Sequence, residues 1–263
     1  MEKNRIQLLK DYFYFLLQST NAHGLHSPFI YSLVTKCFYD KKIYADYQIL
    51  KQYQAELAKD RREILVNDLG AGSKKFRSEK RKINKISKIA GSDSAEMKLL
   101  YRLVKYFKPK QILELGTSLG KATMSMALAN PETKIDTVEG SESILNISKS
   151  YFNRFKLENI NLILSDFDTY LDEISQLNQQ FDFVFMDGNH RYEPSMRYFE
   201  KILRHVHNDT VLILDDIYWS DEMKNAWAEI KNHRQVRQTI DTFHWGFVFF
   251  RKEQFKERFI VRR

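Results

Sequence analysis

Runs of consecutive apolar residues alternate with stretches of helical spacing from about Gln111 onward. Four of these runs end in acidic residues: Glu139, Asp166, Asp187 and the pair Asp215-Asp216. Continuous apolar strands separated by helices are typical of a parallel sheet that is covered on both faces. Since ligands bind at the carboxyl ends of the strands in such a sheet, we expect these acidic side chains to converge on one crevice.

The end of the chain has a different pattern. Two apolar runs, residues 236–240 and 247–250, are separated by too few residues for a crossover helix. They therefore predict an antiparallel hairpin. The whole pattern predicts an α/β, Rossmann-like sheet that is mostly parallel and ends in a C-terminal antiparallel hairpin.

The first 62 residues have helical spacing instead. Ile6, Leu9 and Phe13 share one helix face, Pro28 suits the first turn of a second helix, and a third helix is expected at about 44–59. We predict a helical lid or extension at 1–62, a glycine- and basic-rich connecting segment at 63–94, and the main domain at 95–263. The extension would cover the crevice or form the contact of a homodimer.

The most informative stretch is residues 111–129, where a short apolar run passes through a glycine turn into helix-forming sequence. Gly116 and Gly120 would let a ligand approach the backbone, and the first amides of the helix would face it. Glu139 lies 19 residues after Gly120, where a carboxylate can accept hydrogen bonds from a ribose. The stretch predicts a nucleotide-type cofactor site. The alternative is that the glycines only turn the chain and Glu139 is a solvated strand end.

Two other motifs compete for a role. Residues 68–73, Asp-Leu-Gly-Ala-Gly-Ser, look like a cofactor loop, but a basic run follows them and no strand with a terminal acid comes about 20 residues later. We interpret the Gly70–Gly72 segment as a loop beside the site. His23 and His26 lie at a helix boundary, where turn formation or lining of a substrate site are the alternatives, and no third metal ligand accompanies them.

Composition limits the cellular location of the protein and the ligands that it could bind. A single cysteine, Cys37, excludes an internal disulfide and favours a reducing, cytoplasmic location, and no apolar run is long enough to span a membrane. The net charge is +8, and residues 74–88 carry eight Lys and Arg residues against Glu79 alone. Such a run is usually a solvated loop. The alternative is that it neutralises phosphates of RNA or of a carrier-linked substrate.

These motifs together resemble a known family. The segment Glu114-Leu-Gly-Thr-Ser-Leu-Gly120, followed by Glu139, Asp166, Asp187-Gly-Asn-His190 and Asp215-Asp216, is similar to class I S-adenosylmethionine-dependent methyltransferases. Within that class, the chain looks like the bacterial O-methyltransferases with a D-G-x-H segment. The resemblance covers about residues 95–251 and implies a seven-stranded methyltransferase sheet. It also implies a set of cofactor-binding residues: Glu114, Gly116, Thr117, Ser118, Gly120, Glu139, Gly140, Ser165, Asp166 and Asp187.

The resemblance to methyltransferases agrees with the glycine pattern. A dinucleotide fingerprint needs three glycines beside a pyrophosphate, whereas Ser118 and Lys121 occupy two of the corresponding positions here. The sequence therefore favours S-adenosyl-L-methionine over a nicotinamide dinucleotide.

Comparison with cation-dependent O-methyltransferases suggests a metal site and a base. Asp187, Asp215 and Asp216 would hold Mg²⁺ or another divalent cation, for which carboxylates are suitable ligands. His190 takes the position of the family's lysine and would accept the hydroxyl proton, with Asp187 also catalytic. The alternative is that Asp187 only orients the cofactor, while Asp215 and Asp216 cap a helix near Trp219 and no metal binds.

The sequence as a whole predicts a cytoplasmic enzyme that transfers a methyl group to a hydroxyl oxygen of a small molecule. Two alternatives remain at this stage. One is methylation of RNA or of a carrier-linked substrate bound by residues 74–88, and the other is a non-catalytic relative of the fold. Trp219 and Trp245 are candidates for the rim of an acceptor pocket, and Trp227 is expected in the core.

Overall fold

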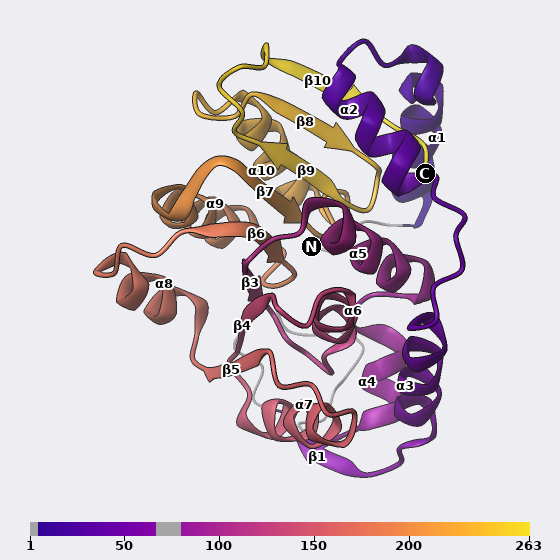
Figure 1. Cartoon of the computed structure of the whole chain (residues 1–263), viewed down its shortest axis with the longest axis vertical. Coiled ribbons are helices and arrows are strands. Elements are labelled where there is room, and N and C mark those ends of the chain that lie inside the picture. Colours follow the sequence, from indigo (N-terminus) through magenta and orange to yellow (C-terminus); the bar gives the residue numbers. More distant parts are fainter. Residues whose placement is uncertain (1–4, 67–79) are drawn as a thin grey trace. The chain divides into compact units, whose positions relative to one another are not determined.

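The computed structural model describes residues 5–66 and 80–263. These residues form two compact units (Figure 1): a central unit, Lys36–Tyr170, and a terminal unit that combines Met1–Thr35 with Leu171–Arg263. The terminal unit is therefore built from both ends of the sequence. The predicted boundaries at residues 62 and 94 stay a prediction.

The central unit contains a parallel sheet of β3 (Gln111–Leu115), β4 (Lys134–Glu139) and β5 (Ile160–Leu164), in that order. Helices α6 (Lys121–Ala129) and α7 (Glu142–Arg154) connect these strands, as the apolar pattern predicts. β4 is the middle strand, and in its register Val138 pairs with Leu115 on one side while Glu139 pairs with Leu164 on the other. This register brings the ends of the three strands to one edge.

Three further helices pack in the central unit: α3 (Tyr47–Lys59), α4 (Ile83–Ile89) and α5 (Ser94–Phe107). Helix α3 contacts α4, α5 and α6, and α5 contacts α6. A capping box fixes the start of α5, because the Asp93 side chain accepts from the Ala95 and Glu96 amides while Glu96 accepts from the Asp93 amide. A short antiparallel hairpin, β1 (Glu63–Leu65) with β2 (Lys80–Lys82), completes this part.

The terminal unit has strands in the order β10-β8-β9-β7-β6. β6 (Phe181–Met186) and β7 (Val206–Leu214) are parallel, and β9 (Gly246–Phe249) is antiparallel to both β7 and β8 (Gln238–Asp241). This confirms the predicted hairpin. β10 (Glu257–Ile260), which pairs in parallel with β8, was not predicted.

Helices from both ends of the chain belong to the terminal unit. They are α1 (Arg5–Gln18), the single turn Ala22–Gly24, α2 (Pro28–Leu33), α9 (Tyr192–Ile202), the turn Leu203–His205 and α10 (Asp221–Asn232). Pro28 is in the first turn of α2, as predicted, and the Ser27 hydroxyl accepts from the Ile30 amide. The π-helical segment Val34–Phe38 and helix α8 (Phe167–Ser175) each include the sequence boundary between the units.

Helix α1 packs against the rest of the terminal unit through a few inward side chains. The Lys224 ammonium donates to Asp11 at 2.8 Å, and the rings of Phe15 and Phe243 lie 5.5 Å apart. Most of the other apolar side chains of α1 are exposed, Leu9, Phe13 and Leu17 among them. Among the described helices, none has the length and apolar character that crossing a membrane requires.

Candidate active site

The predicted cofactor turn joins β3 to α6 in the central unit and has an unusual backbone. Gly116 has φ = 105°, Ser118 has φ = 48° and Gly120 has φ = 67°. Non-glycine residues rarely adopt this left-handed region, so Ser118 marks a strained position of the kind that clusters at ligand sites. The Gly116 and Thr117 amides both donate to the Val138 carbonyl of β4, which fixes the start of the turn against the neighbouring strand.

Gly120 is required by protein packing as well as by its backbone. A Cβ atom at this position would lie 2.3 Å from Cζ of Phe152 and 3.1 Å from the Tyr53 hydroxyl. The sequence pattern attributed this glycine to the approach of a ligand. The structure adds a second reason, because the ring of Phe152, on α7, occupies the space where a larger residue would place its side chain, and the contact of Gly120 with a ligand stays a prediction.

Glu139 lies at the end of β4 and holds two loops together. Its Oε2 accepts from the Ser118 amide and its Oε1 accepts from the Ser141 amide, both at 2.9 Å, so Gly140 lies between two anchored residues. A carboxylate at the end of this strand is the kind of group that accepts hydrogen bonds from a ribose. This geometry agrees with the predicted ribose contact, which stays a prediction.

Glu114 and Thr117 have a second role that the sequence did not indicate. Glu114 is fully buried, and its Oε2 accepts from the hydroxyls of Thr123 and Thr137 at 2.5 Å each. The Thr117 hydroxyl lies 2.6 Å from that of Thr137. This buried network joins β3, β4, the turn and α6. In the structure these two side chains hold the turn, and their predicted contact with a cofactor stays a prediction.

Ser165 and Asp166 follow β5 at the same edge of the sheet. The Ser165 amide donates to the Glu139 carbonyl at 3.2 Å. Asp166 accepts from both the hydroxyl and the amide of Thr169, and these hydrogen bonds hold the pKa of its carboxyl below the usual value. Asp166 therefore caps helix α8. Its predicted contact with an adenine edge stays a prediction.

The predicted catalytic residues lie at strand ends in the terminal unit. Nε2 of His190 is 3.7 Å from Oδ1 of Asp187 and 3.9 Å from Oδ2 of Asp216. All three side chains are half-buried, with exposed fractions of 21%, 14% and 35%. Asp216 and Asn189 have φ angles of 54° and 52°, so the loops that follow β7 and β6 each contain a residue in the left-handed region. The structure thus brings His190 between two carboxylates, at distances longer than a hydrogen bond.

The metal prediction for Asp187, Asp215 and Asp216 is not supported by this arrangement. Oδ1 of Asp215 accepts from the Asp216 amide at 2.8 Å, so this buried side chain is engaged by its own turn. Within residues 5–66 and 80–263, no group of three His, Cys, Asp or Glu side chains has an arrangement that could hold a metal ion. His23 and His26 are covered by the same observation, and His23 lies in a turn that Asn21 caps.

The tryptophans differ in exposure. Trp219 is 37% exposed, and its ring centroid lies 6.5 Å from that of His190, so it remains a candidate rim residue. Trp245 was the other candidate, but it is fully buried and packs edge-on against Phe185, which makes a rim position wrong for it. Trp227 is in the core, as predicted.

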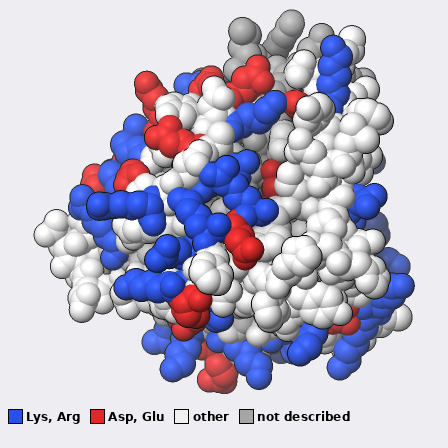
Figure 2. Space-filling model, turned by 90° about the horizontal axis from the view of Figure 1, so that it is seen from above, with Lys and Arg blue, Asp and Glu red and all other residues white. Residues whose placement is uncertain are grey.

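The basic run is described only in part. Lys80, Arg81 and Lys82 form β2, Lys85 and Lys88 lie on α4, and Lys82 pairs with Glu63 at 3.6 Å. Lys74, Lys75 and Arg77 and the glycine loop at 68–73 lie outside the described residues. Positive charge also accumulates elsewhere, since residues 231–263 carry nine Lys and Arg residues against three acids. Figure 2 shows a face on which basic and acidic side chains are interspersed and a broad region has neither.

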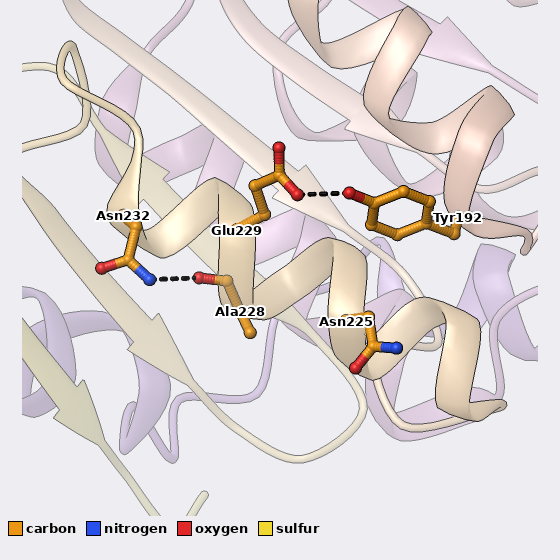
Figure 3. Close-up of a pocket in the computed structure, with 5 residues that line it drawn as sticks. All are labelled: Tyr192, Asn225, Ala228, Glu229 and Asn232. Carbon is orange, nitrogen blue, oxygen red and sulfur yellow. Dashed lines mark hydrogen bonds between the residues drawn. The ribbon is translucent and has the colours of Figure 1, made fainter.

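A surface pocket of about 540 Å³ lies between α9 and α10 (Figure 3). Its lining residues are Tyr192, Asn225, Ala228, Glu229 and Asn232, and none of them is a predicted site residue. The Tyr192 hydroxyl donates to Glu229, which raises the pKa of the phenol, and the Asn232 amide donates to the Ala228 carbonyl. Its polar groups are thus largely engaged with one another.

Comparison with known proteins gives an independent view. The profile of the O-methyltransferase family matches residues 73–243. A tapetum-specific methyltransferase of Arabidopsis thaliana is 27% identical over 154 residues, and a caffeoyl-CoA O-methyltransferase of Stellaria longipes is 26% identical over 162 residues. These matches cover 57% and 56% of this chain. They span 65% and 66%, just under two thirds, of the curated relatives.

Solved structures resemble the chain over a larger part of its length. An SAH-bound methyltransferase of Podospora anserina has a TM-score of 0.58 at 12% identity and covers 96% of this chain and 98% of its own. An O-methyltransferase of Bacillus cereus in complex with SAH has a TM-score of 0.55 at 18% identity, covering 84% and 96%. At these identities the likeness shows the fold, and it confirms the predicted α/β methyltransferase architecture.

Proposed function

Because the chain belongs to the O-methyltransferase family, we propose that it transfers a methyl group from S-adenosyl-L-methionine to a hydroxyl oxygen of a small molecule. The observation that supports this most directly is the turn at 116–120 with Glu139. That carboxylate anchors the Ser118 amide at the end of β4, the position at which an acidic side chain accepts hydrogen bonds from a ribose in folds of this kind. The cofactor would supply a methyl carbon on a positively charged sulfur, which makes the carbon electrophilic.

We assign cofactor binding to the central unit. Ser118, Gly116 and Gly120 would present backbone to the ligand, Glu139 and Gly140 would hold the ribose, and Ser165 with Asp166 would meet the adenine. Glu114 and Thr117 would shape the site from beneath through their hydroxyl network. The start of α6 adds a helix N-terminus, whose partial positive charge favours a carboxylate such as that of a methionine group.

We assign the acid–base chemistry to His190 and Asp187 of the terminal unit. When the acceptor oxygen takes the methyl group and the carbon–sulfur bond breaks, Nε2 of His190 would accept the hydroxyl proton. The imidazolium that results would have two carboxylates, Asp187 and Asp216, within 4 Å, and their negative charge stabilises it. The predicted metal is not part of this proposal, because Asp187, Asp215 and Asp216 do not form a group that could hold a metal ion in the described structure.

The acceptor is proposed to be a flat molecule with a free hydroxyl. Trp219 supports this, because its partly exposed indole lies beside His190 and offers an apolar surface next to the base. Caffeoyl-CoA is a suitable first acceptor to test, since one relative is named for it. We also infer a reducing, cytoplasmic setting, which the presence of a single cysteine, Cys37, supports.

Two measurements, made one after the other, test the proposed function. Calorimetry with S-adenosyl-L-methionine should give saturable binding, and mass spectrometry of reactions with a panel of phenolic acceptors should detect a methylated product. Absence of binding at millimolar ligand would contradict the proposal and favour a non-catalytic relative. Turnover of RNA with steep salt dependence would instead favour the alternative based on residues 74–88.

A further inference from the structure

Two carbonyl groups of the cofactor turn are held from below by side chains of other helices. The Tyr53 hydroxyl, on α3, donates to the Leu119 carbonyl at 2.6 Å. The Ser148 hydroxyl, on α7, donates to the Ser118 carbonyl at 2.7 Å. Both donors are fully buried, and both act on consecutive peptide groups of the same strained turn.

Fixing a carbonyl also fixes the amide of the same peptide group. The chain has no cis peptide bond among the described residues, so the C=O of Ser118 and the N–H of Leu119 point in opposite directions. Ser148 draws that carbonyl toward α7 and therefore turns the Leu119 amide away from it. In the next peptide group, Tyr53 holds the Leu119 carbonyl while the Gly120 amide donates to the Thr117 carbonyl at 2.8 Å. The peptide groups 118–119 and 119–120 are thus both restrained.

The surroundings of Tyr53 suit a permanent donor. Burial raises the pKa of its phenol well above the usual value, so the hydroxyl keeps its proton. Its ring packs edge-on against Tyr151 and Phe155 at 5.5 and 5.4 Å, and the ring of Phe152 covers Gly120. The turn therefore lies on an aromatic cluster contributed by α3 and α7, which leaves the hydroxyl little freedom to move.

We infer that Tyr53 and Ser148 are positioning residues for the cofactor: they orient the 118–120 backbone that would bind S-adenosyl-L-methionine, without touching the ligand. This rests on the proposed function and adds a role for α3. The sequence placed α3 in a helical lid or extension at residues 1–62. In the central unit, α3 supports the turn directly, so a part of the predicted extension would contribute to the cofactor site.

The test compares three hydroxyl deletions. Y53F and S148A each remove one donor to the turn. Y151F is the matched control, because the Tyr151 hydroxyl belongs to the same cluster but donates to Asp60 at 2.9 Å and not to the turn. Calorimetry gives the dissociation constant for S-adenosyl-L-methionine, thermal melts give stability, and steady-state kinetics separate KM for the cofactor from kcat.

We expect Y53F and S148A to raise the dissociation constant and KM roughly three- to tenfold, the effect of one net hydrogen bond, with kcat at saturating cofactor nearly unchanged. All three variants should lower the melting temperature by similar amounts, because each loses one hydrogen bond. Y151F alone should leave the dissociation constant at its wild-type value. If Tyr53 and Ser148 had a merely structural role, all three variants would have the same dissociation constant for S-adenosyl-L-methionine. That result would overturn the inference alone, whereas absence of cofactor binding by the wild-type chain would overturn the proposed function and this inference with it.

Discussion

The turn at residues 116–120 and the strand ends around His190 differ in how firmly their polar groups are held. In the turn, the Ser118 amide, the Ser118 carbonyl and the Leu119 carbonyl all have partners within 2.9 Å. His190 instead lies 3.7 and 3.9 Å from the two nearest carboxylates. A backbone that binds one unchanging ligand is best built rigid before the ligand arrives, whereas a base must approach a proton that changes position during the reaction.

The largest effect, on kcat, is expected at the strand ends around His190. H190Q should lower kcat by about 10²–10⁴-fold, the usual contribution of a positioned base, because glutamine cannot accept the proton. Its dissociation constant for S-adenosyl-L-methionine should stay at the wild-type value. Steady-state kinetics and calorimetry provide both measurements. H244Q, at an exposed histidine between β8 and β9, is the control, and equal kcat in H190Q and H244Q would rule out His190 as the base.

The rigidity of the turn can be tested by overpacking it. G120A places a Cβ atom 2.3 Å from Cζ of Phe152 and adds left-handed strain at φ = 67°, so it should lower the free energy of unfolding by about 2–4 kcal/mol. G91A is the matched control, because Gly91 has φ = 73° but its nearest neighbour, Cδ of Lys121, is 3.8 Å away. G91A should lower the free energy of unfolding by only about 1–2 kcal/mol. Urea unfolding measures both values, and equal losses would show that Phe152 does not restrict the site.

The two regions should also separate binding from turnover. E139Q should raise the dissociation constant for the cofactor by about 10- to 100-fold, because it loses the charge that strengthens hydrogen bonds to ribose and to the Ser118 amide. D187A should mainly abolish turnover. Initial rates over a range of cofactor concentrations distinguish these outcomes. If each substitution changed KM and kcat equally, the division of roles between the regions would be wrong.

The smallest effect concerns Asp166, at the edge of the cofactor region. Its carboxyl has a lowered pKa, first through the hydrogen bond from the Thr169 hydroxyl, so its stabilisation is present above the unfolded pKa and is lost as the pH falls through the folded value. D166N should cost about 0.5–1 kcal/mol at neutral pH, typical of a weakened cap, and nothing in strong acid. Urea unfolding at the two pH values tests this, and a cost that persists in acid would contradict it.

Sequence patterns with local causes predicted much of this molecule. The glycine turn, Glu139 at the end of β4 and the β8–β9 hairpin each leave a signature within a short window, since backbone geometry and burial dictate the residue types there. The fold followed from the order of these windows. His190 was placed by resemblance, and the structure adds Asp216 as a second nearby carboxylate.

Features that depend on distant partners could not be predicted. Tyr53 and Leu119 are 66 positions apart, and nothing near Tyr53 in the sequence indicates that it supports a turn. Phe152 gives a packing reason for Gly120, yet it belongs to a later helix. β10 has two charged residues followed by two apolar ones, without the alternation of a half-buried strand, and it pairs with β8 in parallel, so the sequence carries no hairpin signal for it. Trp245 likewise packs against Phe185 of β6, a partner 60 positions earlier in the sequence.

The composition of the terminal unit has a consequence for biosynthesis. Asp11 pairs with Lys224 and Ser27 with Gln238, at separations of 213 and 211 positions, and Thr20 bridges Val261. During translation α1 and α2 leave the ribosome long before their partners exist, whereas the central unit has all of its own segments by Tyr170. The central unit can therefore fold while the chain is still being made, whereas the contacts of Asp11, Thr20 and Ser27 form only after residues 224–261 have left the ribosome. Until then, a chaperone would need to protect this end of the molecule.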